Sequence, residues 1–314
     1  MRWPIIPPPL QALYAGVLLL LVLASMTGFL LARLRPDRDF RELRARIRTW
    51  WFMAGLFLGV MLLPKRWAIG FFAFLSFLAL KEYFTIIPTR RTDRRVLLIA
   101  YLGIPLQYLW VGMDWYGMFA IFIPVYLFLL IPIRMVLIGD TDGFLRAVGT
   151  LHWGLMTMVY SLSHLAAFLT FTPQVPGTGG GVVWVVLTVF LTQFNDVAQY
   201  FWGRMFGRTP VLPKVSPKKT VEGLLGGMAT TMALALLLGP RLAPVTLLQA
   251  AIIGLIAGLG GFLGDVTISA VKRDLGIKDS GTLLPGHGGI LDRVDSLLVT
   301  APLIFHVVRY LKLY

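Results

Sequence analysis

The sequence predicts an all-α, polytopic integral membrane protein. Of its 314 residues, 57% are hydrophobic and only 14% are charged, and the mean hydropathy is +0.76. A bundle of membrane-spanning helices has this balance, whereas a water-soluble domain does not. The basic residues stand in short stretches between long apolar runs, as in the loops of a membrane protein. This placement argues against nucleic-acid binding, which the net charge of +14 alone would allow.

Apolar runs indicate about ten spanning helices, since one span takes roughly 17–25 residues. The predicted spans are 10–32, 50–64, 67–84, 96–113, 117–133, 147–171, 181–201, 222–239, 246–268 and 294–310. The region 50–84 is also compatible with a tight hairpin or a single kinked element. The first run is too long for a typical cleaved signal peptide and is followed by arginines, so it is predicted to remain as an anchor.

The basic loops alternate in a way that predicts their side of the membrane. Residues 33–48 contain seven arginines, which predicts a cytoplasmic loop. Counting helices onward, four further basic loops fall on the same side: 85–95, 134–146, 202–221 and 269–293. The opposite side receives few basic residues apart from Lys65 and Arg66. Both termini are therefore expected outside.

Polar residues concentrate in the C-terminal third, and the sequence contains neither an internal repeat nor a separate soluble domain. We divide the chain into an N-terminal membrane region, 1–180, and a C-terminal catalytic region, 181–314, with cytoplasmic loops 202–221 and 269–293. The first region is expected to act as a scaffold or in dimerisation. With no cysteine and four scattered histidines, thiolate and histidine-rich metal sites are disfavoured. Oxygen-ligated cations remain open through the aspartates.

Residues 265–295 place basic residues, aspartates, a histidine and several glycines together beside a predicted span. Asp265 is expected at the cytoplasmic end of the ninth helix and Asp292 at the start of the tenth. Two such carboxylates can hold magnesium, whose remaining ligands are then substrate phosphates and water. Basic residues that would neutralise phosphate charge lie between and beside them: Lys272, Arg273, Lys278 and Arg293. A topogenic loop is the alternative, but it needs only basic residues and not the aspartates.

A second polar segment runs from Pro213 to Gly227. Ser216 is predicted to be the N-cap of the eighth helix, with Pro217 at its first position. Lys218 and Lys219 would add positive charge to a helix start that favours anions, such as a triphosphate. The alternative is an ordinary basic cap.

A third segment places Asn195, Asp196 and Gln199 near the cytoplasmic end of the otherwise apolar seventh helix. An ionisable residue inside a span indicates a functional site, although a side chain that reaches the interface is the alternative. The glycines of Gly258–Gly264 resemble a dinucleotide-binding loop only superficially. They lie inside a predicted span with no preceding strand, so they predict close helix packing.

These segments together resemble the phosphatidate cytidylyltransferases, the CDP-diacylglycerol synthases. The run from Ser269 to Asp295 is similar to the family's signature position by position. Two upstream blocks, Asp196–Gly207 and Ser216–Gly223, resemble the family in the same order, so the likeness covers roughly residues 190–300. Two positions depart from it: Gln199 stands where members usually have an aromatic residue, and Ile268 where they often have glutamate.

The resemblance implies that CTP and phosphatidic acid react with magnesium to give CDP-diacylglycerol and pyrophosphate. A second cation remains open. Asp265, Asp292 and, close by, Asp196 would hold the metal. The nucleotide would be handled by Ser216, Lys218, Lys219, Thr220 and Glu222. The phosphates would be lined by Lys272, Arg273, Lys278, Asp279, His287 and Arg293. The resemblance also implies a homodimer in the bacterial inner membrane, with the active site facing the cytoplasm.

The sequence separates other functions from this one to different degrees. A CTP-dependent lipid kinase, or a cytidylyltransferase for another lipid phosphate, is poorly separated by sequence. A CDP-alcohol phosphotransferase is excluded, because the run from Asp142 to Ala147 has the wrong order for that family's motif and no spaced aspartate pair follows. A transporter or scaffold is disfavoured, because transporters tend to place polar breaks in both halves.

Overall fold

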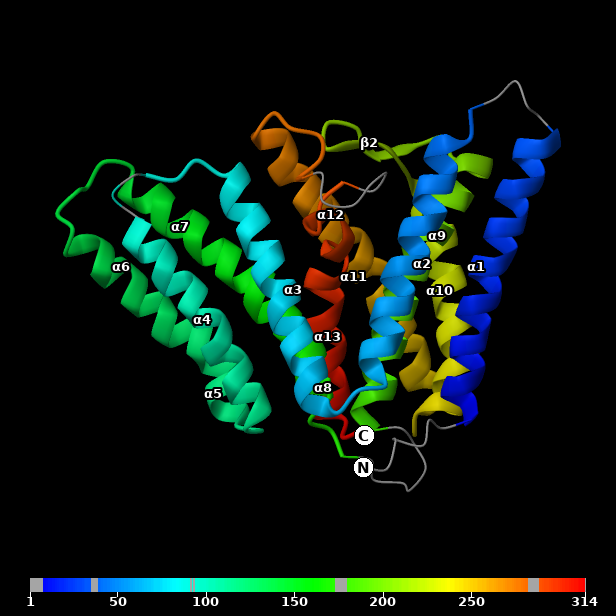
Figure 1. Ribbon diagram of the computed structural model, residues 1–314, viewed down its shortest axis with the longest axis horizontal. Coiled ribbons are helices and arrows are strands. Elements are labelled where there is room, and N and C mark those ends of the chain that lie inside the picture. The colour runs from blue at the N-terminus through cyan, green and yellow to red at the C-terminus, as the bar shows by residue number, and fades with distance from the viewer. Residues whose placement is uncertain are drawn as a thin grey trace.

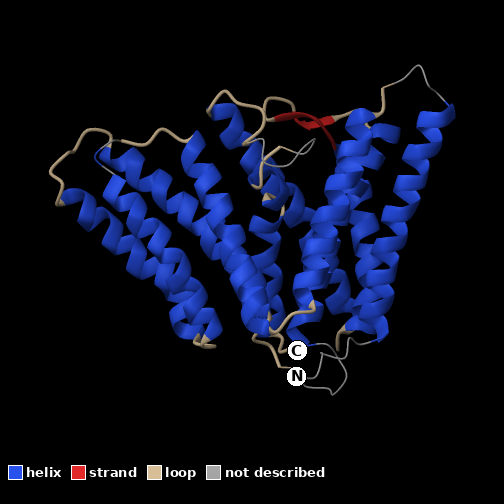
Figure 2. Cartoon of the chain, in the orientation of Figure 1, coloured by secondary structure: helices blue, strands red, loops and turns tan. Residues whose placement is uncertain are grey.

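The computed structural model describes residues 8–34, 39–90, 92, 94–172, 180–281 and 288–313. Within these ranges helices dominate, and the strands form one short hairpin (Figure 2). The predicted all-α class is therefore confirmed. Large apolar side chains are exposed along many helices, as expected for surfaces that face lipid rather than water.

The N-terminal helices run back and forth across the molecule (Figure 1). They are α1 (Pro8–Leu34), α2 (Arg41–Met61), α3 (Lys65–Ile86), α4 (Arg94–Gly112), α5 (Tyr116–Ile121), the π-helix η2 (Phe122–Leu127), α6 (Phe128–Val136), α7 (Phe144–Gly154), the π-helix η3 (Leu155–Ser161) and α8 (Leu162–Phe168). The turn between α2 and α3 is short, but the two helices diverge from it and contact each other little (Figure 1), so region 50–84 is two separate helices and neither a tight hairpin nor a single kinked element.

The C-terminal elements pack around three long helices. They are α9 (Gly180–Phe206), β1 (Pro210–Leu212), β2 (Ser216–Thr220), α10 (Val221–Leu242), α11 (Leu247–Asp274), α12 (Leu291–Val294) and α13 (Leu297–Tyr310). Helix α10 packs extensively against α9 and α11, while α13 packs against α11 and α8. Helix α13 thereby joins the two halves of the chain.

Seven helices in the described ranges are long and apolar enough to cross a membrane. The predicted spans 50–64, 147–171 and 294–310 are not among them. Helix α2 begins with an arginine-rich turn, the α7–η3–α8 run contains two histidines and several hydroxyl side chains, and α13 has only 14 residues. The chain is a multi-pass membrane protein, and the count of ten spans is not confirmed.

The helix ends next to the predicted basic loops lie at one end of the molecule. Figure 1 shows the end of α1, the start of α2, the α6–α7 connection, β2 and the end of α11 at its upper edge. The start of α1 and the C-terminus lie at the lower edge. This arrangement agrees with the alternation of basic loops along the sequence.

The predicted cap at Ser216 is wrong. Residues Ser216–Thr220 form strand β2, which pairs antiparallel with β1. Helix α10 begins only at Val221, and its N-cap is Thr220, whose side-chain oxygen accepts a hydrogen bond from the Gly223 N–H (3.2 Å). Both residues are suitable caps by type, but pairing with β1 keeps Ser216 extended.

The glycines of Gly258–Gly264 do serve helix packing, as predicted. A Cβ at Gly258 would lie 3.1 Å from the Met228 backbone of α10. A Cβ at Gly261 would lie 3.1 Å from the amide nitrogen of Asn195 on α9. The Asn195 side chain also donates to the Gly258 carbonyl (3.1 Å) and accepts from Thr231 (3.1 Å). These contacts fix α9, α10 and α11 together just below the polar end.

Candidate active site

Three carboxylates from distant parts of the sequence meet at the polar end of the bundle. They are Asp196 of α9, Asp265 of α11 and Asp295, which lies between α12 and α13. The three side chains lie within electrostatic range of one another. Ser296 links two of them, since its hydroxyl donates to Asp196 (2.9 Å) and its N–H to Asp295 (2.8 Å). We call Asp196, Asp265 and Asp295 the acidic cluster.

A glycine allows this approach. A Cβ at Gly264 would lie 2.3 Å from the carbonyl oxygen of Asp295 and 2.9 Å from the Cα of Ser296. Neither backbone atom can move aside easily. Because Gly264 has no side chain, α11 can pack directly against the segment that carries Asp295.

Several buried polar atoms around the cluster have no hydrogen-bond partner within the described residues. They include Oδ1 of Asp196, Nε of Arg293 and Nε2 of Gln199. Buried polar atoms are nearly always paired in folded proteins, so such a group indicates a ligand-binding place. An unpaired carboxylate oxygen suits a cation, and an unpaired guanidinium N–H suits a phosphate oxygen.

Strand β2 brings a lysine to the cluster. The Lys219 ammonium lies 2.6 Å from Oδ2 of Asp265 and 5.1 Å from the centre of the Phe262 ring. Lys218, the next residue along the strand, is exposed. Successive side chains of a strand point to opposite sides, which explains the difference. The structure thus separates two lysines that the sequence treated alike.

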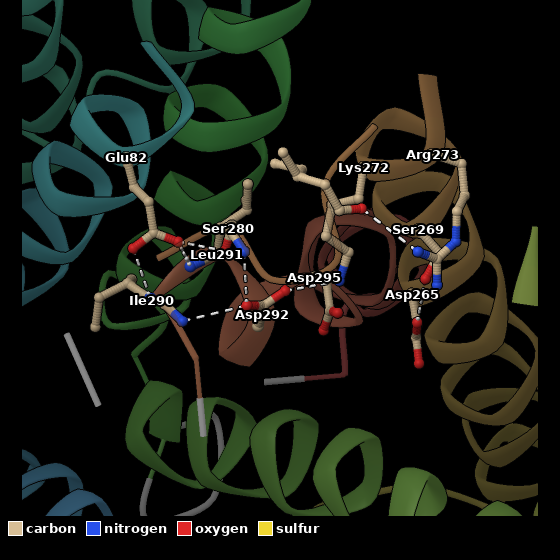
Figure 3. A network of polar contacts seen from close by, with 12 residues as sticks. Glu82, Asp265, Ser269, Lys272, Arg273, Ser280, Ile290, Leu291, Asp292 and Asp295 are labelled. Carbon is tan, nitrogen blue, oxygen red and sulfur yellow. Dashed lines mark hydrogen bonds and ion pairs between the residues drawn. The ribbon is translucent and has the colours of Figure 1, made fainter. Parts of the chain in front are cut away.

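Asp292 lies in a second polar network (Figure 3). Its Oδ1 accepts from the Lys272 ammonium (2.7 Å), and its Oδ2 accepts from the backbone N–H groups of Ser280 (3.1 Å) and Gly289 (3.2 Å). Burial opposes ionisation of this carboxyl group, but the bonds from Lys272 and from the two N–H groups hold its pKa below the ordinary value. Asp292 therefore fixes the signature loop to the end of α11.

A glutamate that the sequence analysis did not select joins this network. Glu82 lies on α3, in the N-terminal half, and its carboxylate accepts from the N–H groups of Ile290 (2.8 Å) and Leu291 (3.1 Å) and from the Ser280 hydroxyl (2.5 Å). Asp295 was likewise within the signature but was not selected. A carboxylate at the end of an apolar span was the available signal for Glu82, and the i, i+3 spacing from Asp292 was the signal for Asp295.

The remaining predicted residues are exposed beside the acidic cluster or stabilise the β1–β2 hairpin. Arg273 is exposed and donates to the carbonyl of Val215 (3.3 Å). Lys278 and Asp279 are exposed as well, and Ser216 is half-buried on β2. Besides the Thr220 cap, Glu222 accepts from the N–H groups of Arg208 (3.0 Å) and Thr209 (3.2 Å).

His287 lies outside the described residues. The roles of all these residues toward CTP, lipid or metal stay predictions.

The oxygen ligands at the acidic cluster fit magnesium. Within the described residues, three or more His, Asp or Glu side chains do not gather tightly enough to enclose a metal ion. Magnesium needs no such cage, since one or two carboxylates plus substrate phosphates and water complete its shell. The unpaired Asp196 oxygen beside Asp265 and Asp295 fits that requirement. Asp292 already uses both oxygens in bonds to protein groups.

A model of the cytidylyltransferase family matches residues 44–311, and the chain belongs to this family. The match includes α3 with Glu82 as well as every carboxylate of the acidic cluster.

The chain is 48% identical over 302 residues to the uncharacterized protein YnbB of Escherichia coli K12. The aligned region covers 96% of this chain and 99% of that protein. It is 43% identical over 129 residues to the phosphatidate cytidylyltransferase of Synechocystis, with 41% of this chain and 44% of that enzyme covered. It is 40% identical over 125 residues to the phosphatidate cytidylyltransferase of Staphylococcus saprophyticus, with 40% and 48% covered. The chain therefore matches less than half the length of these two enzymes.

Proposed function

We propose that the protein transfers the cytidylyl group of CTP to phosphatidic acid. An oxygen of the lipid phosphate attacks the α-phosphorus of CTP, the bond to the β-phosphate breaks, and pyrophosphate leaves. The observation that carries the proposal is the meeting of the acidic cluster with Lys219 and the unpaired Arg293 Nε at one end of a membrane bundle. The names of the relatives support the same lipid substrate.

The chain's own residues would act by positioning and by charge. Arg293 and Lys219 would bind phosphate oxygens, and a phosphate that approached Lys219 would compete with Asp265 for it. Asp196, Asp265 and Asp295 would hold magnesium. Asp292, the other predicted ligand, would join them only by giving up a bond to a protein group, and a second cation remains open. When bound, magnesium would neutralise charge on the phosphates. Reactions at phosphorus depend mainly on such alignment and charge stabilisation, so a protein nucleophile is not required.

The location of the site suits one soluble and one lipid substrate. Lipid phosphates lie at headgroup level, where the ends of spanning helices emerge, and CTP arrives from water. The basic residues beside these helix ends favour the cytoplasmic face of a bacterial inner membrane. We further propose a homodimer, with the N-terminal region as its scaffold.

Label transfer tests the proposal. The purified protein in detergent, given phosphatidic acid, magnesium and CTP labelled at the α-phosphate, is expected to move label into the lipid phase as CDP-diacylglycerol. CTP labelled at the γ-phosphate is the control, since its label should leave with pyrophosphate. Lipid labelled from γ-CTP would instead show a lipid kinase. Absence of transfer from well-folded protein that binds CTP would contradict the proposal, and product mass would reveal another lipid acceptor.

Lys219→Ala is expected to raise the KM for CTP about tenfold or more, as for loss of a charge-assisted contact of about 1.5–3 kcal/mol. The KM for phosphatidic acid should change much less. Lys214→Ala is the matched control, because it removes the same charge from an exposed position of the same hairpin to which no role is assigned. Steady-state kinetics with each substrate varied in turn provide the measurement. A Lys219 variant defective only toward lipid would contradict this placement of the nucleotide.

A further inference from the structure

We infer that Glu82 is a positioning residue of the transferase: it holds both ends of the signature loop in the geometry that the reaction needs. This inference rests on the proposed function. It gives the N-terminal half of the chain a direct part in the active site, although that half carries none of the motifs on which the sequence analysis relied.

The contacts of Glu82 join residues that lie far apart in the sequence. Its carboxylate binds the Ser280 hydroxyl at one end of the loop and the N–H groups of Ile290 and Leu291 at the other. Figure 3 shows Glu82 on α3 pointing across to these three residues. One side chain therefore holds Ser280 next to Ile290 and Leu291. An ionised carboxylate is suited to this task, because its two oxygens accept several bonds, each stronger than a bond between neutral groups.

Glycines of the signature make room for this carboxylate. A Cβ at Gly289 would lie 1.8 Å from Oε1 of Glu82, and one at Gly281 would lie 3.1 Å from its Oε2. The φ angle of Gly289 is not positive, so the backbone conformation does not require glycine at this position. The close approach of Glu82 does. This second glycine of the Gly288–Gly289 pair is thus a space-making residue for a side chain of α3.

Glu82 and Asp292 hold the same segment from two sides. Ser280 gives its hydroxyl to Glu82 and its N–H to Asp292. On the far side of the loop, Gly289 gives its N–H to Asp292, and the next two residues give theirs to Glu82. Asp292 in turn binds Lys272. The position of Lys272, Asp292 and Arg293 relative to the acidic cluster therefore depends on an anchor in α3.

Glu82→Gln tests the inference, since it keeps the shape but replaces one acceptor oxygen with a donor that faces N–H groups. We expect amide hydrogen exchange at Ile290 and Leu291 to become about tenfold faster or more. We also expect kcat to fall on the order of 10- to 100-fold, as for a displaced catalytic group, while the KM for CTP changes by less than about threefold. Glu82→Asp, which keeps the charge, should restore part of both.

Asp142→Asn is the matched control. It makes the same carboxylate-to-amide change at an exposed position of the N-terminal half, so exchange at 290–291 and kcat should stay at wild-type values. Unchanged exchange in Glu82→Gln would overturn the inference, and so would faster exchange with unchanged kcat. Hydrogen exchange is measured without substrate, so it tests the contacts of Glu82 independently of activity. A wild type without transferase activity would refute the proposed function, and the exchange rates would still show whether Glu82 holds residues 290–291.

The Gly289→Ala variant separates positioning from general damage. Its methyl group should displace Glu82 and lower kcat to a similar extent. In a Glu82→Ala background the same methyl group has nothing to displace, so the double variant should be little worse than Glu82→Ala alone. Contacting residues show this non-additivity, whereas independent defects add. Additive losses in kcat would contradict the contact as the reason for Gly289.

Discussion

Asp265→Asn is expected to lower kcat/KM on the order of 10²- to 10³-fold, the loss typical when a preorganised charge is removed from a reacting centre. Asp265 is central in two respects: it belongs to the acidic cluster and it pairs with Lys219 at 2.6 Å. Asparagine keeps the size of the side chain, so the helix packing around Gly264 should survive. The α-labelled CTP assay gives the rate, and a thermal melt in detergent reports the fold.

Asp274→Asn is the control for this prediction. It makes the same change on the same helix, nine residues further along, at an exposed position with no assigned role. Its activity should equal that of the wild type. An Asp265→Asn protein with more than about a tenth of wild-type activity would remove Asp265 from the reacting centre, since a smaller loss falls below the range for a preorganised group.

Asp292→Asn is expected to cost activity and stability together. The change leaves the Lys272 ammonium without its counter-charge, and the side chains of this pair are only 12% and 8% exposed. Breaking a buried pair by removing one partner costs about 3–5 kcal/mol. The melting temperature should therefore fall clearly, with kcat. Asp274→Asn serves as control here as well, and an unchanged melt would contradict the structural role of the pair.

The pH dependence of stability should differ between the Asp292→Asn variant and the wild type. The folded state lowers the pKa of Asp292 below the value of about 3.9 of a free aspartate. The stabilisation from this shift is complete above that value and is lost as the pH falls through the lower folded pKa. Melting curves from pH 7 down to pH 3 should show a smaller acid-induced loss in Asp292→Asn than in the wild type.

The sequence predicted the class of fold and the parts of the site that depend on local pattern. Apolar runs mark the helices because lipid leaves no other partner for the backbone. The packing role of Gly258–Gly264 followed from its place inside a span. The Ser216 cap failed because the choice between Ser216 and Thr220 depends on pairing with β1, which a local pattern does not encode.

The contacts between halves could not be predicted for a different reason. Glu82 binds residues about 200 positions away. Its sequence neighbourhood, an apolar helix with Lys81 beside it, shows only that a charge lies near a helix end. The division between Lys218 and Lys219 likewise required the strand, since a helix start would have placed both on one anion-binding end. Three-dimensional register decides which of two equal residues faces the cluster.

The bonds of Glu82 also restrict how members of the family can recombine. A chain cut at 180/181, the boundary of the motif-bearing region, loses the acceptor for three donors of its own signature loop. Expressed alone, that fragment would contain all its motifs yet lack the carboxylate that binds Ser280, Ile290 and Leu291. A hybrid between two relatives would need a carboxylate at the position of Glu82 and a glycine at the position of Gly289 from compatible parents. A change at one of these two positions, which are 207 residues apart, should therefore require a compensating change at the other.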